Sequence, residues 1–295
     1  MNNIGLSCKK IALFSSFFST SEVPEYIYYY LDEIRKNVDF LVYLTTDEKK
    51  LCERDLLTLA KYVDKIELVK NDGFDFGMWQ KALLKYDVLG KYDELYLIND
   101  SAVCFNSLTP FFNWHEQVSA DVTGMSVSLE IHKHIQSFFI CVKSKALKSV
   151  VNYLIGADFS SKSYEQIIES GELGLSLFLQ KQGYKIKGYY ETGNNNLRNP
   201  THTHCIDAIE FGVPLIKKKL LTNYIEDLIK NLIKRRGVWS HNAIIKEIRK
   251  HSQYKQSDFE KLFSWYSPYK RTRSEYWQGM KWYLQEKWSL FATKR

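Results

Sequence analysis

The sequence contains only five cysteines among 295 residues, and no two of them are spaced as Cys-x-x-Cys. Their odd number and scatter exclude a zinc ribbon and a disulfide framework, and indicate reduced thiols in a cytosolic setting. Long apolar runs are also absent, because no stretch approaches the roughly 18 residues of a membrane span. The run 11–18 follows two lysines as in a signal peptide, but it contains two serines and no small-residue cleavage site follows it, so a buried strand is expected there. These absences predict a protein that is soluble or peripheral to a membrane.

Enough apolar side chain is present for a real core, since 45% of the residues are hydrophobic and 15% are aromatic. A chain of this length predicts one large domain or two modest ones. The charge is divided unevenly: the formal net charge of +7 combines −5 over residues 1–210 with +12 over residues 211–295. Such a contrast predicts that the last third meets an anionic surface, either lipid or nucleic acid.

Apolar runs rich in strand formers alternate with helical periodicity along much of the chain. This alternation predicts crossover units, and hence an α/β fold with a mostly parallel, Rossmann-type sheet flanked by helices. No internal repeat or low-complexity tract interrupts it. The predicted strands are 11–18, 40–45, 65–69, 94–98, 121–126, 137–142 and 185–189; the predicted helices are 24–36, 48–62, 78–89, 108–117, 146–155 and 164–182, with a loop at 191–203 and a helical segment from 217.

A turn-rich segment, 71–77 (NDGFDFG), follows a predicted strand and opens a helix. Glycines in such a place let the backbone approach a ligand closely, and amides at a helix start favour phosphate. The spacing is neither a Walker loop nor a complete Gly-x-Gly-x-x-Gly. An ordinary strand-to-helix turn capped by Asp75 is therefore the alternative interpretation.

A second group of polar residues ends the predicted strand 94–98. Asn99, Asp100 and Ser101 place one carboxylate and two neutral hydrogen-bonding groups at its carboxyl edge, where open α/β sheets bind ligands. One carboxylate beside a diphosphate suits Mg²⁺ or Mn²⁺, which take their other oxygens from water and substrate. Capping of the following turn by Asp100 is the alternative.

Three later segments carry further candidates. Gln136 and Ser137 stand where the chain enters a buried strand, as residues that hold a sugar hydroxyl would. Glu172 stands among glycines before an apolar helix, which suits a general base or an exposed glutamate favoured by the helix dipole. His202 and His204 share one face of an extended chain, which suits a metal ligand, a phosphate donor or a common surface pair.

Taken in order, these segments resemble the rhamnan synthesis protein F family of bacterial polysaccharide glycosyltransferases, over about residues 10–222. Phe74 stands where that family commonly has a basic residue, and 102–105 departs from its usual continuation. The similar motifs are Asn-x-Gly-x-Asp at 71–75, a strand ending in Asn-Asp-Ser at 99–101, His-hydrophobic-Gln-Ser-aromatic-Phe at 134–139, a glutamate-led helix at 172–176 followed by Gly-Tyr at 183–184, Asn-Pro-x-His at 199–202, and Gly-x-Pro-hydrophobic-hydrophobic-Lys at 212–217.

The resemblance implies a nucleotide-sugar-dependent transferase with a GT-A-like fold, often a rhamnosyltransferase of cell-surface polysaccharide, such as lipopolysaccharide O-antigen or capsule. The motif 99–101 would occupy the place of the metal-binding acidic motif, with one aspartate where two are usual. A late histidine would complete a Mg²⁺ or Mn²⁺ site or stabilise the departing diphosphate without a metal. The expected donor-binding residues are Asn71, Gly73, Asp75, Asn99, Asp100, Ser101, Gln136, Ser137 and His202, and the expected metal ligands are Asp100 and His204.

The expected reaction is direct displacement at the anomeric carbon of the sugar. Glu172 is the preferred general base, because inverting GT-A enzymes tend to place one at the start of a late helix, and Asp75 is the second choice. The donor would be a dTDP-, UDP- or GDP-linked sugar, and the acceptor a growing polyprenyl-linked glycan. A non-catalytic carbohydrate- or nucleotide-binding module is the alternative from a different class.

Residues 1–222 are therefore expected to form the transferase domain, and residues 223–295 a helical, basic extension. Its basic clusters, 234–236 and 270–273, are interleaved with tryptophans, a mixture that suits an anionic membrane surface at the inner face of the cytoplasmic membrane. Single-stranded nucleic acid binds a similar mixture but is not the expected partner. Packing of the tryptophans onto the domain is an equal alternative. The tryptophans are Trp239, Trp265, Trp277, Trp282 and Trp288.

Overall fold

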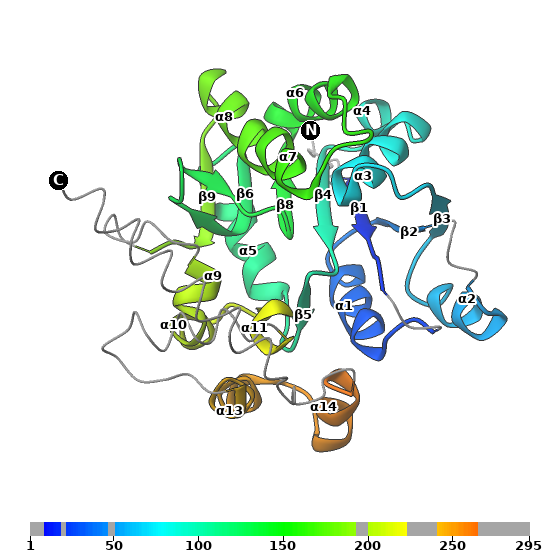
Figure 1. Ribbon diagram of the computed structural model, residues 1–295, viewed down its shortest axis with the longest axis vertical. Coiled ribbons are helices and arrows are strands. Elements are labelled where there is room, and N and C mark those ends of the chain that lie inside the picture. The colour runs from blue at the N-terminus through cyan, green and yellow to red at the C-terminus, as the bar shows by residue number, and fades with distance from the viewer. Residues whose placement is uncertain (1–8, 19–21, 47–50, 193–199, 223–240, 265–295) are drawn as a thin grey trace, which may run out of the picture.

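The computed structural model describes residues 9–18, 22–46, 51–192, 200–222 and 241–264 (Figure 1). Asn199, the five tryptophans and the two basic clusters of the predicted extension lie outside these residues. The described part is built around one eight-stranded sheet in the order β3-β2-β1-β4-β8-β6-β7, with β9 also paired to β6. This sheet, covered by helices, confirms the predicted α/β fold.

The first half of the sheet is parallel. Strands β1 (Lys10–Ser15), β2 (Phe40–Thr46), β3 (Lys65–Val69) and β4 (Glu94–Asn99) pair in parallel, with β1 in the centre. All of β4 and nearly all of β1 and β2 are buried, because helices cover both faces of a parallel sheet. The four strands predicted at 11–18, 40–45, 65–69 and 94–98 correspond to these strands, although β1 ends at Ser15 rather than at residue 18.

The second half of the sheet is mixed. β8 (Phe139–Val142) runs antiparallel to β4 and to β6 (Val122–Ser128), whereas β9 (Ile186–Tyr190) pairs with β6 in parallel. The two-residue strand β7 (His134–Ile135) adds an antiparallel pair at the end of β6. The change of direction occurs between β4 and β8, so the carboxyl end of β4 lies beside the start of β8.

Alternate strand residues enter two separate hydrophobic clusters, one on each face of the sheet. Ala12 and Phe14 belong to one cluster, and Ile11 and Leu13 belong to the other. The first face is covered by α1 (Glu25–Arg35), α2 (Glu53–Leu59), α5 (Thr109–Gln117) and α10 (Cys205–Phe211), and the second by α3 (Phe74–Lys85), α4 (Val88–Lys91), α6 (Ser144–Gly156), α7 (Tyr164–Ile167) and α8 (Gly174–Lys181).

A small second sheet pairs β5 (Ala102–Cys104) with β10 (Leu215–Lys217) in antiparallel register, and α11 (Lys219–Thr222) follows. Neither strand was expected: the region after Ser101 looked irregular, and a helix was predicted from 217. Both strands are three residues long, too short to show a periodicity. Their pairing places residues 217–219 beside the end of β4.

Several predicted helix boundaries are wrong. Helix α3 begins at Phe74 rather than residue 78, because Gly73 in the left-handed conformation turns the chain directly into the helix. The helix predicted at 164–182 consists of α7, a π-helical turn (Ile168–Leu173) and α8. Within the described part of the predicted helix 48–62, only α2 is helical, and the predicted loop 191–203 ends in a short helix, α9 (Pro200–Thr203).

The last described helices, α13 (His241–His251) and α14 (Gln256–Leu262), lie at one end of the molecule, against α10 and α1 (Figure 1). Ile244, Ile248 and Leu262 are fully buried in the same cluster as α1 and β5. Part of the predicted extension thus packs on the sheet domain, although the predicted division at residue 222 stays a prediction. No helix in the described ranges is long and apolar enough to cross a bilayer.

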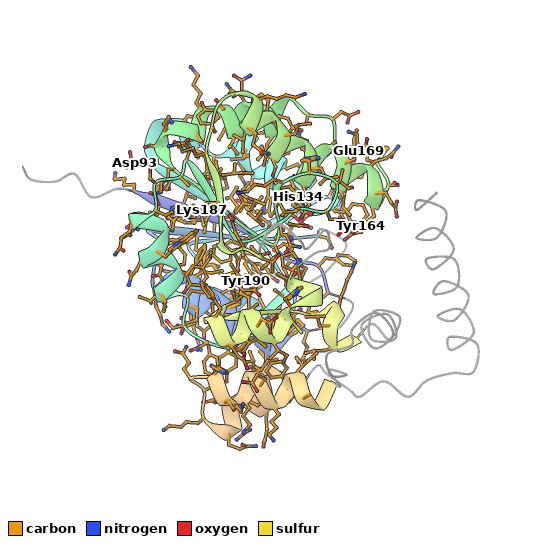
Figure 2. The ribbon with its side chains drawn as sticks, turned by 90° about the vertical axis from the view of Figure 1, so that its left-hand side faces the viewer. Asp93, His134, Tyr164, Glu169, Lys187 and Tyr190 are labelled. Carbon is orange, nitrogen blue, oxygen red and sulfur yellow. The ribbon has the colours of Figure 1, made fainter. Side chains whose placement is uncertain are left out.

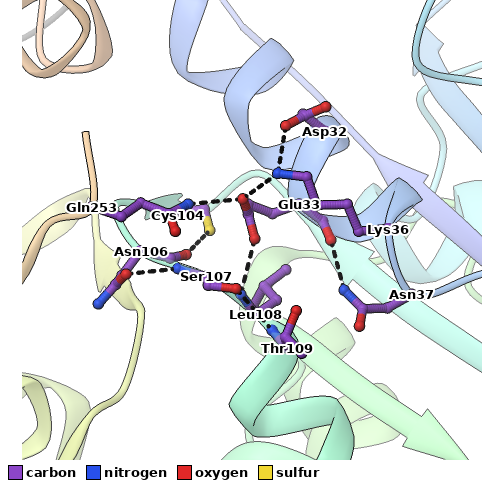
Figure 3. Close-up of polar contacts among 10 residues, drawn as sticks. All are labelled: Asp32, Glu33, Lys36, Asn37, Cys104, Asn106, Ser107, Leu108, Thr109 and Gln253. Carbon is purple, nitrogen blue, oxygen red and sulfur yellow. Dashed lines mark hydrogen bonds and ion pairs between the residues drawn. The ribbon is translucent and has the colours of Figure 1, made fainter. Parts of the chain in front are cut away.

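A buried glutamate joins these helices to the rest of the fold (Figure 3). Glu33 of α1 is 1% exposed and accepts hydrogen bonds from the Leu108 backbone amide at 3.1 Å and from Gln253 Nε2 at 2.8 Å. Lys36 Nζ lies 2.6 Å from the same carboxylate. The Glu33 carboxylate therefore satisfies groups from three separated parts of the chain.

Replacing this carboxylate should destabilise the fold. In Glu33→Gln, the amide nitrogen cannot accept one of these hydrogen bonds and the charge beside Lys36 is lost, so we expect a loss of about 2 kcal/mol in the free energy of unfolding. Asp32→Asn is the matched control, because Asp32 is half exposed and contacts the same lysine. The control should lose less than about 0.5 kcal/mol in chemical denaturation. Equal losses in the two variants would contradict the role assigned to Glu33.

Candidate active site

A cavity of about 530 Å³ opens at the carboxyl ends of β1 and β4, the edge at which open α/β sheets bind ligands. Figure 2 shows His134 and Tyr164, both of which line the cavity, in the same part of the molecule. Eight predicted site residues line it, although they come from four separated segments: Asn71, Asp75, Asn99, Asp100, Ser101, Gln136, Ser137 and Glu172.

A chain of hydrogen bonds crosses the floor of the cavity. Asn99 Nδ2 donates to Asp75 Oδ2, and Asn99 Oδ1 accepts from the hydroxyl of Ser101 at 2.7 Å. The Ser101 hydroxyl in turn accepts from Lys217 Nζ at 3.2 Å. The end of β4 therefore connects a carboxylate of α3 to an ammonium group of β10.

Asp75 lies in the first turn of α3 and is partly buried. Burial raises the pKa of its carboxyl to about 6, the hydrogen bond from Asn99 opposes this shift, and the negative charge of Glu172 adds to it. Asp75 Oδ1 also accepts from the Phe76 backbone amide at 3.1 Å. Asp75 is therefore a carboxyl group that gains a proton readily when further negative charge arrives.

Glu172 is held on the other side of the cavity by two donors. The Ser137 backbone amide donates to Glu172 Oε2 at 2.6 Å, and His134 Nε2 lies 3.5 Å from Glu172 Oε1. Burial alone would raise the pKa of Glu172, but hydrogen bonding to His134 and Ser137 lowers it below the usual range. The carboxylate is therefore oriented and ionised.

The local structure around Glu172 differs from the expectation. Glu172 does not begin a helix: it lies in the π-helical turn of a helical segment that starts at Tyr164, where Ser163 and Gln166 form a capping box. A π-turn adds a residue to the helical turn and shifts the side chains that follow it. This inserted turn presents Glu172 to β7 and the start of β8.

His134 supports the Glu172 carboxylate from β7. Its Nδ1 donates to the His132 carbonyl oxygen at 2.8 Å, which leaves Nε2 facing Glu172. Burial lowers the pKa of His134, but hydrogen bonds to Glu172 and His132 outweigh it and raise the pKa overall. His134 was not among the expected site residues, although it stands in the sequence motif 134–139.

Asp100 contacts groups that do not resemble metal ligands. Its Oδ2 atom lies 3.3 Å from Lys218 Nζ and accepts from the hydroxyls of Ser16 at 3.2 Å and Tyr26 at 3.4 Å. Across the described residues, no group of three or more histidine, cysteine, aspartate or glutamate side chains is placed to hold a metal ion. These donors do not fit the Mg²⁺ or Mn²⁺ expected beside Asp100.

Two expected residues, Gly73 and His204, are not among the described residues that line the cavity. The left-handed Gly73 packs against Phe159, and a Cβ atom at residue 73 would lie 2.7 Å from the Phe159 carbonyl oxygen. His204 precedes α10 and is half-buried. His202 lies in α9, and its side chain is outside the described part. Gln136 does line the cavity, and its Oε1 accepts from Thr201 Oγ1 at 3.1 Å, which ties α9 to the site.

The cavity also contains groups that were not expected from the sequence. Lys217 and Lys219 supply ammonium groups, and Phe74 and Tyr164 supply aromatic rings whose centres are 5.7 Å apart. The three consecutive lysines directly after the apolar residues 215–216 are the sequence signal that could have predicted Lys217 and Lys219. No sequence signal placed Tyr164 beside Phe74.

The fold and site together define a Rossmann-like α/β protein whose cavity, at the carboxyl edge of its parallel strands, is lined by carboxylates, lysines and aromatic rings. Among solved structures, the chain is similar to a Bacillus anthracis protein described as a glucose-1-phosphate thymidylyltransferase, with 11% identity, 63% of this chain and 87% of that one covered, and a TM-score of 0.41. It is also similar to a cytidylyltransferase from Leptospira borgpetersenii, with 11% identity, 84% and 98% covered, and a TM-score of 0.39. No curated protein gave a significant match.

The family model of rhamnan synthesis protein F matches residues 9–272, which is most of the chain. The protein therefore belongs to the rhamnan synthesis protein F family, and the resemblance seen in the sequence motifs is confirmed. The match extends beyond the predicted 10–222 and includes α13 and α14.

Proposed function

We propose that the protein is a glycosyltransferase that moves a sugar, rhamnose or another hexose or deoxyhexose, from a nucleoside diphosphate to a growing cell-surface glycan. The observation that carries the proposal is the placement of two carboxylates, Asp75 and Glu172, and a lysine, Lys217, around one cavity at the carboxyl edge of β4. Glycosyl transfer by direct displacement needs a base for the acceptor hydroxyl and positive charge for the departing diphosphate. Family membership supports the same activity.

Glu172 is the proposed base. When a diphosphate enters beside Lys217 and Ser101, its negative charge raises the pKa of nearby Asp75 above the value of about 6 that burial already produces. Asp75 is then protonated and donates a hydrogen bond to the donor. Glu172 has a lowered pKa and stays ionised, so it is the carboxylate able to accept the proton of the acceptor hydroxyl.

The two carboxylates should therefore respond differently to neutral replacements. Asparagine imitates the protonated form of Asp75, so Asp75→Asn should retain the affinity for donor to within about tenfold and lower kcat by less than about tenfold, the cost of one altered neutral hydrogen bond. Steady-state kinetics with varied donor concentration provides the measurement. A loss of several hundredfold in kcat would make Asp75 the base instead.

The pH dependence of kcat/KM separates the same alternatives without a mutation. A base must be deprotonated, so the rate falls as pH falls through the pKa of the base. With Glu172 as base, we expect the acid limb to lie below the usual glutamate range, because hydrogen bonds from His134 and Ser137 lower the pKa of Glu172. An acid limb centred near pH 6 in the free enzyme would identify Asp75.

The proposal as a whole is tested with a panel of dTDP-, UDP- and GDP-linked sugars, read by release of the nucleoside diphosphate. Transfer or slow hydrolysis of one donor supports it. Tight binding of a donor with no release in the presence of glycan acceptors would favour a non-catalytic binding module. The polyprenyl-linked acceptor and a position at the inner face of the cytoplasmic membrane belong to the same proposal, and liposome flotation of the full chain tests the membrane contact.

A further inference from the structure

Three consecutive lysines, Lys217, Lys218 and Lys219, run past the end of β4. The pairing of β10 with β5 places Lys217 opposite Ala102, and the Lys218 backbone amide donates to the Ser101 carbonyl oxygen at 2.9 Å. Residues more than a hundred positions apart in the sequence are thereby held side by side. We call residues 217–219 the lysine run.

The middle lysine neutralises Asp100. Lys218 Nζ lies 3.3 Å from Asp100 Oδ2 and donates to the Tyr26 hydroxyl at 2.7 Å, with the ammonium group 4.9 Å from the centre of the Tyr26 ring. Asp100 is 8% exposed. A divalent cation bound at this oxygen would lie close to the ammonium charge and be repelled by it in a poorly solvated place. Lys218 thus supplies the positive charge next to Asp100 that a divalent cation would otherwise supply.

The outer lysines face the cavity. Lys217 Nζ lies 3.2 Å from the Ser101 hydroxyl and 4.2 Å from the centre of the Phe138 ring, and Lys219 Nζ lies 3.5 Å from the Tyr164 hydroxyl. These contacts orient the two ammonium groups at the cavity, and the positive charge of Lys217 also favours the ionised forms of Asp75 and Glu172. Both side chains line the same cavity as Glu172.

We propose that Lys217 and Lys219 bind the diphosphate group of the substrate and that this binding requires no divalent cation. The inference rests on the proposed function for the identity of the substrate. In the transfer step, the bond between the anomeric carbon and the diphosphate oxygen breaks and its electron pair stays on that oxygen. The acceptor oxygen forms the new bond to the carbon, and its proton goes to Glu172. The charge that develops on the leaving oxygen is stabilised by the two ammonium groups.

Calorimetric binding of inorganic pyrophosphate in EDTA tests this inference on the full chain. We expect measurable binding without metal, weakened roughly tenfold in Lys217→Met and in Lys219→Met, since each removes a charge-assisted hydrogen bond. Lys261→Met is the matched control, because Lys261 lies on α14 and is 61% exposed, and it should change the affinity by less than about twofold. Binding that is unchanged in both cavity variants would overturn the inference.

The wild-type protein offers a second readout that does not depend on the folding of variants. Added Mg²⁺ chelates pyrophosphate, so it should weaken the apparent affinity, and added NaCl should weaken it through screening. Pyrophosphate binding that appears only with Mg²⁺ would overturn the inference and leave the proposed glycosyl transfer standing. Metal-free binding combined with no transfer from any nucleotide sugar would contradict the proposed glycosyl transfer and leave the metal-free binding of pyrophosphate standing.

Discussion

Glu172→Gln is expected to lower kcat for sugar transfer by at least roughly a hundredfold while donor affinity changes little. The reason is that general-base catalysis typically contributes about 10²–10⁴ in rate, and a carboxamide cannot accept the proton. The glutamine retains an oxygen for the Ser137 amide, so the π-helical turn should keep its position. Rates of diphosphate release at saturating donor, together with donor titrations, measure the two effects separately.

Glu169→Gln is the matched control for this variant. Glu169 belongs to the same π-helical turn but is exposed and is not among the residues that line the cavity (Figure 2). Its replacement makes the same change of charge on the same element and should leave kcat within about twofold, as a surface substitution away from the site does. Near-normal transfer by Glu172→Gln would show that Glu172 is not the base, and equal losses in the two variants would point to a disturbed turn.

The second large effect is expected at Gly73, through stability. Gly73 has a φ of +88°, and a Cβ atom at this position would lie 2.7 Å from both the Cβ and the carbonyl oxygen of Phe159. The left-handed conformation costs alanine about 1 kcal/mol, and the forced contact about 2 kcal/mol more. Gly73→Ala should therefore lose about 3 kcal/mol in the free energy of unfolding, measured by chemical denaturation.

Gly183→Ala isolates the contact from the backbone conformation. Gly183 has a similar φ of +80°, but nothing lies within 4 Å of the place of its Cβ atom. It should lose only about 1 kcal/mol, the conformational part. If both variants lose the same amount, the close approach of residues 73 and 159 is not what requires glycine at position 73. Because Gly73 directs the chain into α3, its replacement should also disturb Asp75.

The carboxyl edge of the parallel strands is the part of the site that could be predicted best. Asn99, Asp100 and Ser101 stand at the end of a buried apolar strand. Asp75 follows a glycine turn that comes after another strand. Because strands and helices alternate in parallel, the ends of these strands meet at one edge of the sheet. Glu172 was expected at the site only through the family resemblance. Its contacts with β7 and β8 depend on a π-helical turn, whose one-residue insertion leaves no periodicity in a single sequence.

The electrostatic surroundings of Asp100 could not be predicted. A lone aspartate after a strand suits a metal ligand, and nothing near it in the sequence supplies a cation. Lys218 reaches it from 118 residues later, through the pairing of two three-residue strands. Such short pairs depend on non-local packing, since three residues carry too little hydrophobic pattern to specify a partner.

The sequence by itself therefore determined what its local physics controls: the alternation that produces an α/β sheet, and polar residues at strand ends. The tertiary structure alone decided which of those polar residues meet, that His134 faces Glu172, and that a lysine stands beside Asp100. The pKa of a carboxyl group depends on burial and on charges within a few ångströms, so the division of roles between Asp75 and Glu172 comes from the folded arrangement rather than from residue type.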